Sequence, residues 1–167
     1  MENGGKIEMK VEGLTLDPVT NMPIIILKDS KGEKVLPIWV GIFEANAIAL
    51  EMEKISTPRP MTHDLIKNII NGLDAKINHI CVNDLKDNTF YAQISVQING
   101  GDVDIDSRPS DAIAVALRFK APILVARKVL EEARSFDVAA DSKLGDSEQW
   151  GKWLKNVKPD DFGKIDQ

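Results

Sequence analysis

From Thr89 to Asn99, apolar and polar residues alternate without a break. Alternate side chains of an extended strand point to opposite faces, so one face of this strand is expected to be buried and the other solvated. Gly100-Gly101 follows directly, and this pair predicts a tight hairpin turn into a further strand over 102–106. The chain is therefore expected to contain an antiparallel hairpin whose apolar face needs a covering layer.

Two blocks of strands are expected, separated by a helical stretch. In the first block, alternation over 7–11 predicts a half-buried strand, and the apolar run 23–27 predicts a second. A third strand is expected over 35–40, where Pro37 indicates a sheet edge or a bulge because proline has no N–H to donate. The second block adds a strand over 76–85 to the hairpin described above.

Apolar residues at helical spacing predict four helices in the first 134 residues. They are expected over 42–54, from an N-cap at Thr62 to Leu73, over 109–120 and over 126–134, with a short strand at 122–125. The stripe of the second helix is expected to contain Ile66, Ile69, Ile70 and Leu73. These elements predict an α+β fold of mostly antiparallel strands in two β-rich blocks, with the helices packed on one side.

The chain is expected to divide into a domain over 1–134, a polar linker over 135–145 and a C-terminal helix and tail over 146–167. Trp150, Trp153, Leu154 and Val157 have the spacing of an amphipathic helix in this tail. The helix is expected either to pack on its own domain or to contact a partner, because aromatic anchors concentrate at interfaces. The spacing does not choose between these two.

Composition limits where this protein works and what it binds. Its 167 residues suit one domain, and a net charge of −5 argues against a broad basic surface for nucleic acid while leaving room for a local cluster of arginines. The single cysteine, Cys81, cannot form an intrachain disulfide and is expected to be a buried, unreactive thiol. Residues 1–6 lack the apolar core of a signal peptide, and no run approaches the roughly 20 apolar residues of a membrane span. We expect a cytoplasmic protein.

Two short segments share a pattern, Arg-Pro-Met-Thr-His-Asp over 59–64 and Asp-Ser-Arg-Pro-Ser-Asp over 106–111. Each places an arginine, a hydroxyl and a carboxylate around a proline, directly before a predicted helix. Proline is tolerated in a first helical turn, where exposed N–H groups attract anions and an arginine can bind phosphate through two hydrogen bonds. The same residues are also expected of two ordinary helix starts, so both interpretations stay open.

These segments, with others, resemble the bifunctional nuclease domain family. The matching stretches are Leu-Pro-Ile-Trp-Val-Gly over 36–41 with Glu44-Ala45, Arg-Pro-Met-Thr-His-Asp-Leu over 59–65, Thr-Phe-Tyr-Ala over 89–92, and Asp-Ser-Arg-Pro-Ser-Asp-Ala-Ile-Ala over 106–114. The resemblance extends over roughly residues 7–134, and residues 148–163 are similar to the tail of some members. It implies a nuclease acting on RNA and DNA.

Hydrolysis of a phosphodiester requires a positioned water, stabilisation of the charge on phosphate and a proton for the leaving oxygen. The candidates are His63, Asp64, Glu44 and Asp111 for catalysis, Arg59 and Arg108 for phosphate binding, and Asp106, Ser110 and Thr62 for structural support. A divalent cation such as Mg²⁺ or Mn²⁺ is a further candidate, with ligands expected from His63, Asp64 and Asp106. Phosphate-binding loops, dinucleotide fingerprints and H-E-x-x-H zinc motifs are absent from the chain.

Several candidates also have ordinary structural explanations. Asp64 and Asp111 fall in first helical turns, where a carboxylate is favourable whatever the function. Arg108 follows the end of an acidic strand, so an ion pair with Asp106 is the contact most expected of it.

Other polar residues are expected to be structural or solvated. His63 and Glu44 stand near helix starts, where either can serve as a cap rather than in catalysis. Asp102 and Asp104 are expected on a solvated strand face, and His79 is expected to be structural because further metal-type ligands at suitable spacing are missing around it.

Two classes of function remain open from the residues alone, beside a purely structural domain in which both arginine-proline segments form only helix caps and ion pairs. One is a nuclease with RNA or DNA as substrate. The other is a non-catalytic oligomeric module that binds a protein partner or a small anionic ligand, which the acidic net charge and the tryptophan-containing tail favour. In either case a homo-oligomer is expected, because edge-prone strands and an amphipathic tail offer surfaces to cover.

Overall fold

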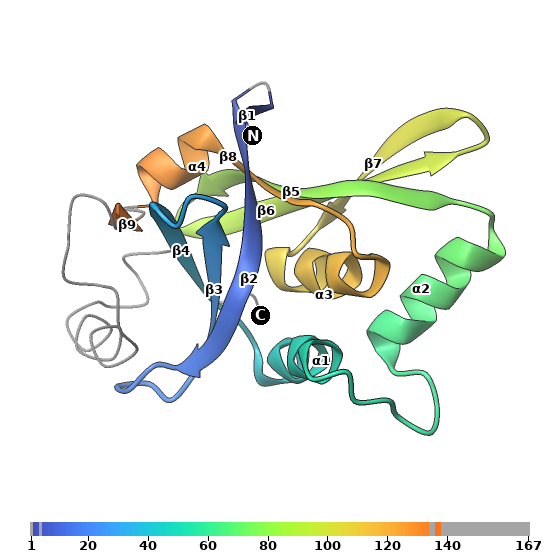
Figure 1. Ribbon diagram of the computed structural model, residues 1–167, viewed down its shortest axis with the longest axis horizontal. Helices are drawn as coiled ribbons and strands as arrows, with labels where there is room; N and C mark the ends of the chain where they lie inside the picture. Colours follow the sequence, from blue (N-terminus) through green and yellow to red (C-terminus); the bar gives the residue numbers. More distant parts are fainter. Residues whose placement is uncertain (1, 4, 134–135, 138–167) are drawn as a thin grey trace.

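The strands of the two predicted blocks join into one sheet (Figure 1). The computed structural model describes residues 2–3, 5–133 and 136–137, and the predicted C-terminal helix lies outside them. The strands are β1 (Glu2–Asn3), β2 (Lys6–Leu16), β3 (Pro23–Asp29), β4 (Lys34–Trp39), β5 (Lys76–Lys86), β6 (Thr89–Ile98), β7 (Gly101–Ser107), β8 (Ile123–Ala126) and β9 (Phe136–Asp137). Within the described residues their order is β7-β6-β5-β8-β2-β3-β4-β9, and β1 pairs with β2.

The short strand β8 joins the two blocks. It runs parallel to β5, with Cys81 opposite Leu124, and antiparallel to β2, with Ile7 opposite Val125. The other pairings among the described strands are antiparallel, as expected for an α+β protein. The apolar run predicted as a strand at 122–125 therefore lies near the middle of the sheet, which accounts for the burial of Ile123, Leu124 and Val125.

The predicted hairpin is confirmed, but its turn lies one residue earlier. Asn99 and Gly100 both have positive φ, and Ile98 pairs with Gly101, so Asn99-Gly100 form the turn and Gly101 begins β7. Two successive residues with positive φ match the twist of a two-residue hairpin, and asparagine followed by glycine tolerates that conformation best. β7 forms one edge of the sheet, and its residues 101–106 are exposed as expected for the aspartates there.

The other edge lies at β4 and β9. Phe136 and Asp137, which fall in the expected linker, pair with Val35 and Lys34 at the start of β4. At Pro37, β4 pairs only with β3 among the described strands, so the proline lies at a sheet edge as predicted.

Three of the four predicted helices pack side by side on one side of the sheet, the lower side in Figure 1. They are α1 (Ile42–Met52), α2 (Thr62–Gly72) and α3 (Pro109–Phe119), and α3 lies between the other two and against β5 and β6. α4 (Arg127–Glu132) follows β8 and packs on β5 and β8. No helix of the described residues is both long and apolar enough to cross a membrane.

The helix α2 corrects two sequence-based expectations. Its N-cap is Met61 rather than Thr62, and the N–H of Met61 is bound by the Asp64 carboxylate in the first turn. Its stripe is also narrower than predicted, because Ile66 and Ile70 pack on the core whereas Ile69 and Leu73 are exposed. Only one side of α2 meets α3, so a second row of apolar residues faces solvent.

The core lies between the sheet and the central helix α3. Five consecutive residues of this helix, Ala112–Ala116, are buried, because α3 is enclosed by the sheet and by both neighbouring helices. Three of these five are alanines, whose small side chains let the helix approach its neighbours closely. Cys81 is buried as predicted, and this burial raises the pKa of its thiol, which disfavours the thiolate.

Candidate functional site

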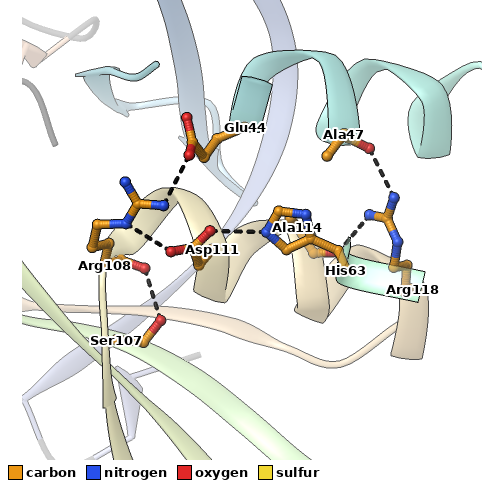
Figure 2. A network of polar contacts seen from close by, with 8 residues as sticks. All are labelled: Glu44, Ala47, His63, Ser107, Arg108, Asp111, Ala114 and Arg118. Carbon is orange, nitrogen blue, oxygen red and sulfur yellow. Dashed lines mark hydrogen bonds and ion pairs between the residues drawn. The ribbon is translucent and has the colours of Figure 1, made fainter. Parts of the chain in front are cut away.

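The two arginine-proline segments meet where α2 and α3 begin (Figure 2). His63, the second residue of α2, lies with its Nε2 atom 2.8 Å from Oδ1 of Asp111 in the first turn of α3. An ionised carboxylate can only accept a hydrogen bond, so Nε2 carries a proton and donates the hydrogen bond to Asp111. The contact spans 48 residues of sequence and exists because the two helices pack against each other.

The His63 ring is fixed by this contact and by burial. Its side chain is only 9% exposed. In the neutral ring that donates from Nε2, Nδ1 is the unprotonated nitrogen, and Nδ1 has no hydrogen-bond partner among the described residues. The carboxylate thus orients the imidazole, and the neutral form of the ring can accept a proton at Nδ1.

Arg108, the N-cap residue of α3, lies beside the same carboxylate. Its Nε donates to Oδ2 of Asp111 at 2.7 Å, and its Nη2 donates to Oε1 of Glu44 in α1 at 2.9 Å (Figure 2). The ion pair expected with Asp106 is wrong. The chain turns from β7 into α3 at Arg108, so the side chain reaches the first turns of two helices, whereas Asp106 remains on the exposed edge strand.

The charges of this group keep Asp111 ionised. Burial by itself would raise the pKa of Asp111, but the hydrogen bonds from His63 and Arg108 outweigh it and lower that pKa. The hydrogen bond to Asp111 is likewise the largest cause of the raised pKa of Arg108, assisted by Glu44. The result is a carboxylate that holds an imidazole on one side and a guanidinium on the other.

Glu44 reaches Arg108 because Gly41 leaves space for it. Gly41 is the N-cap of α1, and a Cβ added there would collide with the Glu44 carboxylate. The Glu44 side chain is 17% exposed and forms an ion pair with Arg108, so it is not free to act as a simple surface cap. The glycine of the Leu-Pro-Ile-Trp-Val-Gly stretch is therefore part of the site's construction.

Arg118 is a residue of this network that the sequence analysis did not single out. Its side chain is 3% exposed, and it donates to Oδ1 of Asp64 at 2.7 Å, to the Ala114 carbonyl at 2.9 Å and to the Ala47 carbonyl at 3.1 Å. Figure 2 shows it at the opposite end of the group from Arg108. The signal was present in the sequence, since an arginine in an otherwise apolar helix needs a buried partner.

Asp64 forms its ion pair with Arg118 and not with the His63 imidazole. The hydrogen bond from Arg118 is the largest cause of the lowered pKa of Asp64, followed by the N–H of Met61. Asp64 thus closes the first turn of α2 and joins it to α3 and, through Arg118, to α1.

The remaining candidates differ in their exposure. Arg59 precedes α2 and Thr62 is its first residue, and both are exposed. Asp106 is exposed on β7, and Ser110 is completely buried in the first turn of α3. Among the described residues, no group of three or more His, Cys, Asp or Glu side chains is placed to hold a metal ion. Of the expected ligands, His63 contacts Asp111 and Asp64 contacts Arg118, whereas Asp106 is exposed on β7, so the described residues do not bring the three together.

Comparison with known proteins identifies relatives along most of the chain. The model of the bifunctional nuclease domain matches residues 25–137. An uncharacterized protein of Mycobacterium tuberculosis is 37% identical over 162 residues, which are 93% of this chain and 97% of that protein. Bifunctional nuclease 1 of Arabidopsis thaliana is 29% identical over 107 residues, 62% of this chain and 33% of the plant protein. Bifunctional nuclease 1 of Oryza sativa subsp. indica is 22% identical over 68% of this chain and 35% of its own length.

Proposed function

The chain belongs to the bifunctional nuclease domain family, and on this premise we propose that it hydrolyses phosphodiester bonds in RNA or DNA. The observation that supports this most is the contact between His63 and Asp111, which unites the two arginine-proline segments. This chain aligns with only about a third of the length of the plant relatives whose names describe nucleases. The substrate and the reaction of this chain are therefore part of the proposal.

In the proposed reaction, His63 transfers protons. Nδ1 accepts a proton from the attacking water while Nε2 donates to Asp111, and the imidazolium that forms is stabilised by this carboxylate. The water oxygen bonds to phosphorus, and the phosphorus–oxygen bond to the leaving nucleoside breaks. The leaving oxygen is then protonated by the imidazolium or by solvent. Asp111 therefore orients the base and does not itself react.

Arg108 is the proposed phosphate-binding group. Its Nε and Nη2 are held by carboxylates, while Nη1 has no partner among the described residues and the side chain is 38% exposed. Two fixed hydrogen bonds orient the guanidinium so that its outer N–H groups can bind a phosphate oxygen. The carboxylates of Glu44 and Asp111 also cancel most of the charge of Arg108. The affinity for phosphate is therefore expected to be modest and to depend on the orientation of the guanidinium.

The test compares the two histidines of the chain. His63→Ala is expected to lower the rate of cleavage of fluorescent RNA and DNA oligonucleotides by about 10²–10⁴-fold, the usual contribution of a general base. His79→Ala, on β5 outside the network, is the matched control and should cleave like the unaltered protein. Equal cleavage by both variants, prepared identically, would assign the activity to a contaminant or to another site.

The exposed apolar residues favour a second role, self-association, which we propose alongside cleavage. Leu65, Ile69 and Leu73 are 52–60% exposed along one row of α2, and Val103 and Ile105 on β7 are 48–49% exposed. A contiguous row of exposed apolar side chains of this kind is typical of an interface. Light scattering should give an oligomer for the unaltered chain and a smaller mass for Ile69→Lys. A monomer in both cases would contradict this role.

A further inference from the structure

Phe43 is the most exposed large apolar residue of the described chain, at 86%. It lies in the first turn of α1, between the exposed Ile42 and Glu44, and only polar Asn46 is exposed in the next turn. An aromatic ring left in water loses the stabilisation that burial of so large a surface would give. Its position on the surface is explained when the ring contacts something outside the described residues.

Two residues of α1 close to Phe43 in sequence, Glu44 and Ala47, contact the two arginines of the site. Glu44, the neighbour of Phe43, is hydrogen-bonded to Arg108, and Cα atoms of adjacent residues are about 3.8 Å apart. Ala47, one turn later on the same side of α1, accepts a hydrogen bond from Arg118 through its carbonyl. Phe43 therefore lies in the first turn of α1, directly before the residue that holds Arg108.

From these observations we propose that Phe43 stacks on an unpaired nucleobase of a single-stranded substrate whose phosphate is bound at Arg108. The inference rests on the proposed nuclease function and specifies its substrate class. Any base offers a flat face to an aromatic ring, whereas the bases of a duplex are already stacked and are not available without unpairing. Phe43 would thus favour single strands without choosing a sequence.

The charge of the protein and the size of the patch both favour a base as the occupant. With a net charge of −5 and Arg108 already paired with two carboxylates, contacts to phosphates can supply little affinity, so stacking must supply more of it. A standard protein interface needs about 20–30 residues a side, whereas the exposed apolar surface of this turn consists of Ile42 and Phe43. A single ring is enough for one base.

The experiment measures binding separately from cleavage by using the His63→Ala chain throughout. A short fluorescent oligodeoxynucleotide is titrated as a single strand and as a duplex with its complement. We expect Phe43→Ala to weaken single-strand binding by about 5-fold or more, Phe43→Trp to retain it, and Phe43→Leu to behave like the alanine variant. Duplex binding should be weaker and unaffected by Phe43→Ala. Raising the salt concentration should weaken single-strand binding only slightly.

Val19→Ala is the matched control, since Val19 is 72% exposed in the turn between β2 and β3 and belongs neither to the network nor to the proposed interface. It should bind the single strand like the parent chain. Unchanged single-strand binding by Phe43→Ala, or full binding by Phe43→Leu, would overturn the stacking role. A fall in mass on light scattering with unchanged oligonucleotide binding would do the same and would assign Phe43 to an interface between protein chains.

Failure of this inference and failure of the proposed function give different results. If the chain with His63 cleaves oligonucleotides but Phe43→Ala has no effect on their binding, only the stacking role is wrong. If the oligonucleotide binds through Phe43 but His63→Ala and the unaltered chain cleave equally, the stacking role stands and the proposed catalysis is wrong.

Discussion

At the scale of single residues, Gly41 shows how a position without a side chain contributes to the site. Its φ of −68° is accessible to any residue, so glycine is not needed there for its backbone. What matters is the space above its Cα, which the Glu44 carboxylate occupies. Glu44 in turn holds Arg108, so the absence of one methyl group affects a guanidinium that belongs to another helix.

Gly41→Ala is therefore expected to displace the Glu44 carboxylate from Arg108 while the fold is retained. The atom that the new methyl group meets is the end of a flexible side chain, so the loss in free energy of unfolding should stay within about 1 kcal/mol. Cleavage should fall to the level of Glu44→Gln. Gly72→Ala, where a Cβ meets no atom within 4 Å, is the matched control and should leave cleavage unchanged.

At the scale of secondary-structure elements, the site depends on how α1, α2 and α3 are held together. Arg118 donates hydrogen bonds to a residue of each of these helices, and Asp64 is its only carboxylate partner among the described residues. This contact sets the start of α2, and the start of α2 carries His63. The stripe of α2 was predicted too wide because its periodicity shows where apolar residues recur but not how much of the helix another element covers.

The contact between Asp64 and Arg118 predicts how stability depends on pH. The pKa of Asp64 is lowered in the folded protein, so its ionised form contributes stability that is fully present well above the usual value of 3.8 and is lost as the pH falls through the lowered pKa. In urea unfolding, the difference in the free energy of unfolding between the unaltered chain and Asp64→Asn should be constant above about pH 5.

Below that pH the gap should narrow as Asp64 becomes protonated. The Asp64 side chain is 35% exposed, so solvent screening makes the gap smaller than for a fully buried pair. Asp74→Asn, an exposed aspartate outside the network, should follow the curve of the unaltered chain. A gap that widened toward acid pH would contradict the assigned contact.

At the scale of the whole molecule, β8 turns two β-rich blocks into one sheet. Ile80 of β5 lies opposite Ile123 of β8, and both are buried in the core shared with α3. Each half of the molecule therefore shares its apolar surface with the other, and neither has a separate core. The prediction of an α+β fold is confirmed, whereas the pairing that joins the blocks was not part of it.

Unfolding of the described domain is accordingly expected to be cooperative. Ile80→Ala removes a fully buried side chain and should lower the free energy of unfolding by about 2–5 kcal/mol. Hydrogen exchange should show the same loss of protection in β3 and in β6, which belong to different blocks. Ile69→Ala, at 52% exposure, is the control and should have a much smaller effect. Loss of protection confined to β6 would show that the blocks unfold separately.

The sequence by itself determined the longer strands and the helices, the hairpin of β6 and β7, and the family, but not the two-residue strands β1 and β9. These depend on local periodicity, on turn residues and on motifs that are contiguous in the chain. Only the tertiary structure decided that Arg108 pairs with Glu44 and Asp111 rather than Asp106, and that Arg118 holds Asp64. The physical reason is that these partners lie on separate helices, so their contacts depend on how the helices pack, which no local pattern specifies.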